Sequence, residues 1–197
     1  MNLIDRVKNI LLTPITEWDV ISGESATQQS LLMSYVLPLA LVAAIGSILK
    51  VTLFAGIVSF GIKYAVTAAV IAFITAVAGY YLTVFIVDML APSFGSEKDM
   101  GKSAQLVAYS ATPGYVAGLL SFIPVLGALI ALAGMVYGIY LMYLGIGPIK
   151  KTPEDKKVIY IIVAYAIMIA IGFVLAAVLG AALFGAIGYG SVSRFGM

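Results

Sequence analysis

The stretch VIYIIVAYAIMIAIGFVLAAVLGAALFGAI at positions 158–187 decides the class of fold. It carries no charged residue over 30 positions, and about 20 apolar residues are enough for a helix to cross a bilayer. Four earlier runs approach or exceed that length: Ser30–Leu49, Tyr64–Leu90, Ala104–Ile123 and Val125–Ile149. The sequence therefore predicts an all-α polytopic membrane protein, a compact bundle of five transmembrane helices preceded by an N-terminal amphipathic surface helix.

The composition leaves little room for a water-soluble domain. Of the 197 residues, 62% are apolar and 10% are charged, whereas a soluble domain is typically about 25% charged. The chain has no cysteine and no histidine, which removes thiol nucleophiles, imidazole and thiolate metal ligands, and the usual general base. We therefore expect no enzyme, no metal and no cofactor. A net charge of +2 gives no reason to expect a nucleic acid partner.

Residues 1–29 are predicted to lie at the cytoplasmic membrane surface. Apolar residues share one helical face over the first 12 positions: Leu3, Val7, Ile10 and Leu11. This pattern is typical of an amphipathic helix in the headgroup region. Thr13 and Pro14 predict the end of this helix and the start of another, and Trp18 is predicted to contact lipid headgroups. Residues 30–190 form the predicted five-helix domain, and 191–197 a short tail outside.

Several motifs predict helix ends and interruptions. Ser25 with Gln28 three residues later is a capping-box pattern that would start the first span. The stretch 152–155 predicts a threonine cap, followed by proline and acids, for the last span. Pro38 predicts a kink within the first span, with a gate as the alternative. Residues 51–62 are apolar but too short to cross, and they are predicted to be interfacial or re-entrant.

Small residues at four-residue spacing predict closely packed helices. The positions are Ala68, Ala72 and Ala76 with Gly79, then Gly114 and Gly118, Gly134 and Gly138, and Ala181 and Gly185. Small side chains let helix backbones approach one another. The same faces could join copies of this chain, or this chain and another protein, but packing within one chain explains the pattern equally well.

The distribution of lysine and arginine predicts the orientation. With the N-terminus inside, the inner side carries eight of these residues: Arg6, Lys8, Lys98, Lys102, Lys150, Lys151, Lys156 and Lys157. The outer side carries three, Lys50, Lys63 and Arg194, so the positive-inside rule is obeyed and five spans put the C-terminus outside. Lys150, Lys151, Lys156 and Lys157 are predicted to contact anionic lipid headgroups, although topology setting alone would also explain them.

Asp88 is the main candidate for a functional polar group, because it is the only acid within a predicted span. A charge inside a bilayer is costly and therefore marks a functional candidate by default. Its place near the cytoplasmic end favours an ion-pairing or helix-end role, with Lys98, Lys102 or Lys150 as the partner. Proton or ion handling is the alternative.

Other polar side chains in the spans carry weaker signals. Five small hydroxyl residues can bond to helix carbonyls or across helices: Ser47, Thr75, Thr83, Ser110 and Thr112. Three tyrosines advance three residues at a time along the fourth span: Tyr137, Tyr140 and Tyr143. They could line a cavity, although packing between helices or at the interface is favoured.

The segments from the third span onward resemble a known family. AYSATPGY at 108–115 leads into IPVLG at 123–127, then GIYLMYLG at 138–145 and KKTPEDK at 150–156. These stretches are similar to the YIP family, the Ypt/Rab-interacting membrane proteins, in its bacterial branch. The residues that carry the resemblance are Tyr109, Pro113, Gly114, Tyr115, Pro124, Gly127, Tyr140 and Gly145.

The resemblance implies five membrane helices, a cytoplasmic N-terminus and motifs that are structural rather than catalytic. Eukaryotic members act at endoplasmic reticulum and Golgi membranes, bind Rab-type GTPases, associate with one another, and are linked to vesicle formation and membrane shaping. This sequence lacks their long N-terminal region and its acidic Tyr-Gly-Pro motif, so Rab binding is not carried over. We expect a non-enzymatic organiser of the membrane or of partner proteins in the bacterial inner membrane. A small transporter, channel or lipid-moving protein using Asp88 is the alternative.

Overall fold

The computed structural model describes residues 2–54, 57–123 and 125–192, and every regular element in these ranges is helical. The α-helices are α1 (Leu3–Leu12), α2 (Pro14–Ser22), α3 (Gln28–Leu31), α4 (Leu37–Phe54), α5 (Ile57–Leu90), α6 (Met100–Ser110), α7 (Thr112–Leu119), α8 (Leu126–Lys150) and α9 (Lys157–Val192). The shorter elements are the π-helical η1 (Leu32–Val36) and the 3₁₀ turns η2 (Ala91–Phe94), η3 (Leu120–Phe122) and η4 (Glu154–Lys156). The all-α prediction is confirmed.

Four stretches within the described residues are long and apolar enough to cross a membrane. They are Gln28–Lys50, Phe73–Phe94, Leu126–Lys150 and Glu154–Val174. The predicted third span, Ala104–Ile123, is not among them because the chain breaks between α6 and α7 at Ala111. Pro113 follows in the first turn of α7, where its missing N–H breaks no helical hydrogen bond. Among the described residues, four of the five predicted spans are therefore found as continuous helices long enough to cross, and the third run is divided into two shorter helices.

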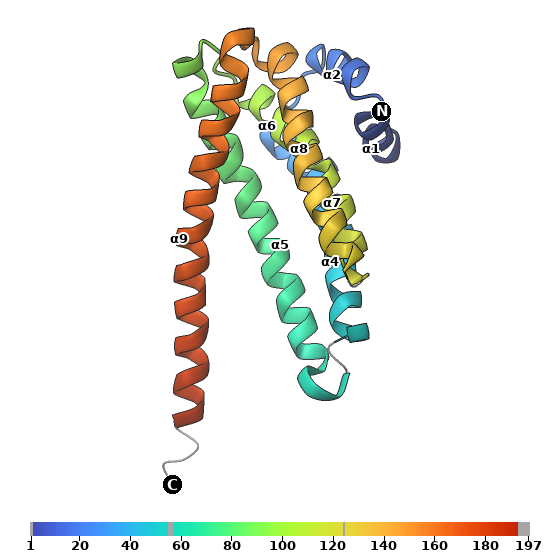
Figure 1. Cartoon of the computed structure of the whole chain (residues 1–197), viewed down its shortest axis with the longest axis vertical. Helices are drawn as coiled ribbons and strands as arrows, with labels where there is room; N and C mark the ends of the chain where they lie inside the picture. The colour runs from blue at the N-terminus through green and yellow to red at the C-terminus, as the bar shows by residue number, and fades with distance from the viewer. Residues whose placement is uncertain (1, 55–56, 124, 193–197) are drawn as a thin grey trace.

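Helix α6 lies inside the bundle (Figure 1). Every side chain from Ser103 to Ser110 is buried, and the helix packs against α3, α5 and α8. Helix α7 continues the run between α4 and α8, while α9 packs on α5 and α8. The third run thus forms the interior around which the long helices are arranged.

The first span changes helix type just before its proline. Its capping box is Thr27 with Ser30, each side chain bonding to the backbone of the other, so the predicted Ser25 start is two residues too early. Over η1 the chain takes a wider π turn, which closes with Leu37 N–H donating to the Leu32 carbonyl. Such turns are a common cause of helix bends, and this one accommodates Pro38 without interrupting the span.

Residues 51–62 are not a separate segment. Residues 51–54 complete α4 and residues 57–62 begin α5, two long helices that pack on each other and are joined at the far end of the bundle (Figure 1). The predicted separate short segment is therefore replaced by the ends of two long helices, and an interfacial position of these residues stays a prediction. The two residues between these helices, Pro124, and 193–197 of the predicted tail lie outside the described residues.

Glycines bring the helices into close contact at three positions that the spacing predicts, Gly118, Gly134 and Gly138, and also at Gly46, whereas Gly79 and Gly114 of the same pattern have open space beside them. A Cβ on Gly46 would overlap the backbone of α7, and one on Gly118 would lie 2.8 Å from the Ala43 Cβ. On α8, a Cβ on Gly134 would lie 2.9 Å from the Pro113 carbonyl oxygen, and one on Gly138 would meet the Ser110 carbonyl at the same distance. Small residues therefore serve packing within this chain at these positions.

The link from α8 to α9 differs from its prediction. Lys151 ends α8 in the left-handed region, with φ of 52°, and η4 precedes α9. The Thr152 side chain is buried and donates to the Ile146 carbonyl oxygen at 3.0 Å, so it accepts from Ser96 at 2.8 Å. Since this hydroxyl is used between segments, Thr152 does not cap the last helix.

Candidate functional site

Asp88 and Lys150 meet inside the protein at one end of the bundle. The Lys150 Nζ lies 3.2 Å from the Asp88 Oδ1, and their side chains are only 0% and 4% exposed. The ammonium also donates to the Ser103 hydroxyl at 2.7 Å and to the Asp99 carbonyl oxygen at 3.2 Å. Ser103 in turn donates to Asp88 at 2.9 Å. All three donors of the lysine are therefore satisfied.

This closed arrangement explains how two charges are tolerated in the interior. A buried ion pair is stable only where good geometry and further hydrogen bonds offset the loss of water. Of the three lysines named by the sequence, Lys150 is the partner of Asp88, as the ion-pairing interpretation predicts. Lys102 instead donates to the carbonyl oxygens of Ser22 and Glu24, and Lys98 is exposed.

Two of the four lysines predicted to contact lipid headgroups do not reach the surface. Lys150 is fully buried, and Lys157 is 8% exposed and pairs with Glu154 at 2.5 Å. That prediction is therefore wrong for both, because their ammonium groups are used within the protein. Lys151 and Lys156 are exposed, and headgroup contact stays a prediction for them.

Trp18 is part of the core rather than a lipid anchor. Its side chain is 1% exposed, and it lies so close to Gly145 on α8 that a Cβ there would be 2.6 Å from the indole ring. Its edge meets Tyr109 on α6, with ring centroids 6.2 Å apart. The predicted headgroup contact is wrong, because α2 folds back onto the bundle and buries the indole against α8.

Arg6 joins α1 to α2 and to the link that follows. Its guanidinium donates to the Glu17 Oε1 at 2.6 Å and to both carboxylate oxygens of Glu24 at 2.5 and 2.6 Å. It also lies 5.2 Å from the centroid of the Tyr109 ring, a cation–π distance. Burial lowers the pKa of Arg6, but the Glu24 hydrogen bond and the nearby carboxylates outweigh it, so the pKa lies above its ordinary value. The sequence interpretation treated Arg6 only as a topology charge and missed this role.

Replacing Arg6 by methionine is expected to lower the free energy of unfolding by about 3 kcal/mol, because Glu17 would stay buried without a counter-ion. Proteolysis within residues 1–24 should become faster, since α1 would be released from α2. Lys8→Met is the matched control, because Lys8 is an exposed cation on the same helix. Equal protease sensitivity in the two variants would show that Arg6 does not hold this end together.

The remaining family-motif residues lie at separate positions in the structure. Gly127 begins α8 tightly, because a Cβ there would lie 2.9 Å from the Ser121 carbonyl oxygen. Tyr140 is 45% exposed. Gly114 and Tyr115 line a cavity, so the motif residues do not form one common site.

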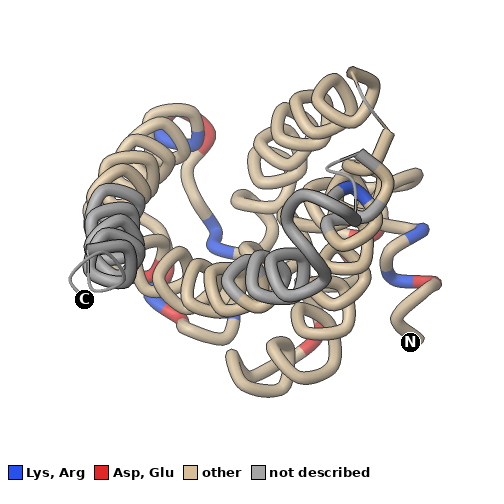
Figure 2. The backbone as a smooth tube through the Cα atoms, turned by 90° about the horizontal axis from the view of Figure 1, so that it is seen from below, with Lys and Arg blue, Asp and Glu red and all other residues tan. Residues whose placement is uncertain are grey.

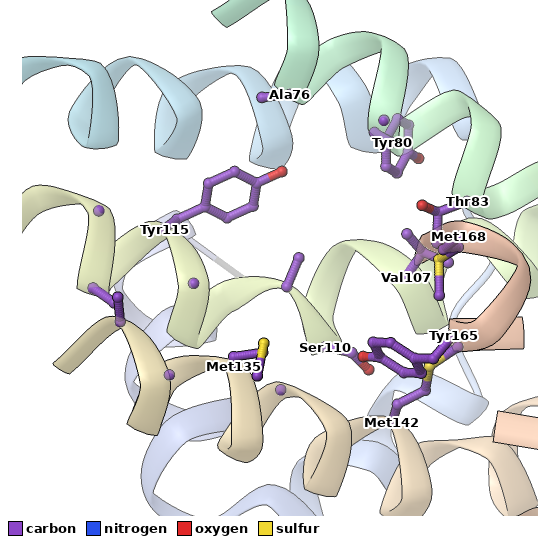
Figure 3. A pocket seen from close by; sticks show the side chains of 18 of the residues that line it. Ala76, Tyr80, Thr83, Val107, Ser110, Tyr115, Met135, Met142, Tyr165 and Met168 are labelled. Carbon is purple, nitrogen blue, oxygen red and sulfur yellow. The ribbon is translucent and has the colours of Figure 1, made fainter. Parts of the chain in front are cut away.

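That cavity, of about 540 Å³, lies among α5, α6, α7, α8 and α9 (Figure 3). Most of its lining is apolar or small, and hydroxyl groups come from Tyr80, Thr83, Ser110, Tyr115, Ser121 and Tyr165. The sequence did not predict this cavity, since no single helix carries a pattern for it. The tyrosines considered for a cavity lie elsewhere: Tyr137 donates to the Leu11 carbonyl oxygen at 2.7 Å and stacks on Tyr140, and Tyr143 contacts Lys157.

Charged residues gather in short stretches of chain rather than along the long helices (Figure 2). The group assigned to the inner side belongs to α1, to the link between α5 and α6 with the start of α6, and to the end of α8, the start of α9 and the link between them. Within the described residues, no cluster of His, Cys, Asp and Glu could hold a metal ion. The geometry offers ion pairs that fix helices and a mainly apolar cavity.

Apolar spanning helices, with their few buried charges paired in the interior, define a multi-pass α-helical membrane protein. The chain belongs to the Yip1 domain family, whose model matches residues 8–178, from α1 into α9. The predicted YIP resemblance is thus confirmed for the family, while the bacterial branch stays a prediction. Comparison with curated proteins and with solved structures gave no match.

Proposed function

We propose that this Yip1-family protein is a non-enzymatic organiser of its bilayer, and that α1 and α2 act as a shallow wedge in one leaflet. The observation that carries the proposal is a set of large apolar side chains that point away from the protein on these two helices. Ile4 is 76% exposed, Leu12 69% and Ile15 64%. Amphipathic helices with such faces enter the headgroup boundary to a depth of about 5–10 Å.

Because the wedge is fixed to the bundle, it would displace lipid instead of being displaced itself. Trp18 attaches α2 to α8, and Arg6 attaches α1 to α2. Figure 1 shows both helices together at one end of the molecule, beside α8. A body that adds area to one leaflet and not to the other favours a curved membrane.

We place this end in the cytoplasm, where its exposed lysines would attract anionic lipids. Lys8, Lys98, Lys151 and Lys156 are exposed there, and each such charge contributes about 1 kcal/mol near an anionic surface. We further propose that partner proteins, or other copies of this chain, are gathered through lipid-facing helix surfaces.

Ion or proton transport through Asp88 remains the second hypothesis, and the geometry supports it less. The carboxylate is held by Lys150 and Ser103, an arrangement suited to joining α5, α6 and α8. The buried charged side chains among the described residues are Arg6, Glu17, Asp88, Lys150 and Lys157, and each is ion-paired. This use of charge also supports our proposal that the protein works without catalysis.

The wedge is tested by the triple variant Ile4→Asn, Leu12→Asn and Ile15→Asn in proteoliposomes. We expect the unmodified protein to produce smaller or tubular vesicles by electron microscopy, and the triple variant to leave vesicle diameter close to that of protein-free controls. Thr16→Asn with Asp19→Asn is the matched control, because both residues are exposed polar positions on α2. Vesicles of equal size with the unmodified protein and the triple variant would remove the wedge from the proposal.

A further inference from the structure

We propose that the cavity among α5, α6, α7, α8 and α9 is a binding site for one hydrocarbon chain of a membrane lipid. The Ser110 hydroxyl would bond to a polar atom of that lipid, such as an ester carbonyl oxygen. This inference concerns the interior of the bundle and is independent of the wedge on α1 and α2.

The walls suit a flexible apolar chain. Ligand cavities typically measure about 300–1,000 Å³ and are mostly apolar with a few polar groups, and this one, at about 540 Å³, fits that description. Met135, Met142 and Met168 line it, and methionine adapts its shape to varied ligands. Gly79 and Gly114 leave open space, because no described atom beyond their own turn of helix lies within 4 Å of a Cβ built on either.

Ser110 points to an occupant that can form a hydrogen bond. Its side chain is 5% exposed, and its Oγ has no hydrogen-bond partner among the described residues. A buried hydroxyl left without a partner is destabilising. By contrast, the Tyr80 hydroxyl already donates to the Gln28 carbonyl oxygen at 3.0 Å. Ser110 lines the same cavity as Tyr165 and Met142 (Figure 3), and the polar part of an occupant would lie at Ser110.

The depth of the cavity favours lipid over water or ions. Thr83 lines it five residues before Asp88, so the cavity begins about 7.5 Å along α5 from the ion pair. This places it within the candidate spans Phe73–Phe94 and Leu126–Lys150, where the surrounding solvent is hydrocarbon. None of the described lining residues is charged, which disfavours an ion, and apolar cavities do not hold water well.

A second protein chain does not fit the available space. A helix about 10 Å wide occupies roughly 400 Å³ for every turn of 5.4 Å. The cavity would therefore hold little more than one turn, far less than a spanning helix. A lipid chain is thinner and can bend along the walls.

The test uses phosphatidylcholine that carries a photoreactive diazirine in one acyl chain, reconstituted with the full-length protein in vesicles. Labelled positions are mapped by mass spectrometry. We expect labelling at the cavity residues Tyr115 and Met135, and severalfold less in Gly79→Leu and in Gly114→Leu, whose side chains would fill the cavity. Gly172→Leu is the matched control, because Gly172 is exposed on α9 and also has open space for a Cβ. Its labelling should equal that of the unmodified protein.

Three outcomes would overturn the lipid site. One is undiminished labelling of Tyr115 and Met135 in both leucine variants, each shown to be folded by circular dichroism. Another is labelling no stronger at these residues than at Phe173, which is 72% exposed to bulk lipid. The third is a loss of labelling in Gly172→Leu as large as in the two cavity variants, which would mean that filling the cavity is not its cause. The two leucine variants lie on different helices, so a folding failure of one leaves the other informative.

Ser110→Ala tests the polar contact separately. Without lipid, in detergent, the variant should melt at a slightly higher temperature, because it removes an unsatisfied hydroxyl. When the proteins are purified from the vesicles, less of the diazirine lipid should stay bound to the variant than to the unmodified protein. Equal retention would remove Ser110 from the lipid contact and leave only the apolar walls.

Discussion

Asp88→Asn is expected to lower the free energy of unfolding by about 3–5 kcal/mol, because it leaves the Lys150 ammonium buried without a counter-ion. Lys150 has no exposed surface, so water cannot replace the lost carboxylate. Chemical unfolding in detergent, followed by circular dichroism, measures the loss. Glu97→Gln is the control, since it breaks the exposed pair with Lys151 and should cost no more than about 1 kcal/mol.

A double variant, Asp88→Asn with Lys150→Met, separates structure from transport. Removing both partners of a buried pair is often close to neutral, so most of the lost stability should return. Ion and proton flux in proteoliposomes should be unaffected by the single variant. Stability equal to that of the unmodified protein, together with loss of a measurable flux in Asp88→Asn, would instead assign Asp88 to a transport path.

Trp18→Ala is expected to cost about 3–5 kcal/mol, because it opens a large void between α2, α6 and α8. Thermal unfolding is followed by circular dichroism, because the variant has lost the only tryptophan and its fluorescence cannot be used. Leu12→Ala is the matched control: Leu12 is 69% exposed, and truncation of exposed side chains usually changes stability by less than about 0.5 kcal/mol. Equal melting temperatures for the two variants would mean that the indole faces lipid after all.

The sequence predicts the parts of this fold that depend on local pattern. Long apolar runs give four of the long helices, Thr13 and Pro14 mark the start of α2, and glycine spacing identifies close contacts at Gly118 and Gly134. The ion pair can also be predicted in part, because an acid in a span needs a counter-charge at the same depth in the membrane and few lysines lie at that depth. Which of these lysines pairs with Asp88 depends on where α5 and α8 approach each other, and the sequence does not specify this.

Other features depend on partners that are distant in the chain. Trp18 has the flanking residues of a lipid anchor, and only Gly145, 127 residues later, makes room for its burial. The break before Pro113 is hidden, because proline is tolerated within membrane helices. Thr152 begins a good capping pattern, yet its hydroxyl bonds to Ser96 and to the Ile146 carbonyl oxygen instead of capping the helix. The cavity is a space between five helices, so no local pattern marks it.

The pairing of Asp88 with Lys150 also imposes an order on synthesis. The two residues are 62 positions apart, so at roughly 5–20 residues per second the aspartate leaves the ribosome about 3–12 seconds before its lysine. During that interval α5 has an acid but no cation to meet it, and the carboxylate must stay near the headgroups. The arrival of α8 then draws α5 and α6 together, which makes this end of the bundle a late product of insertion.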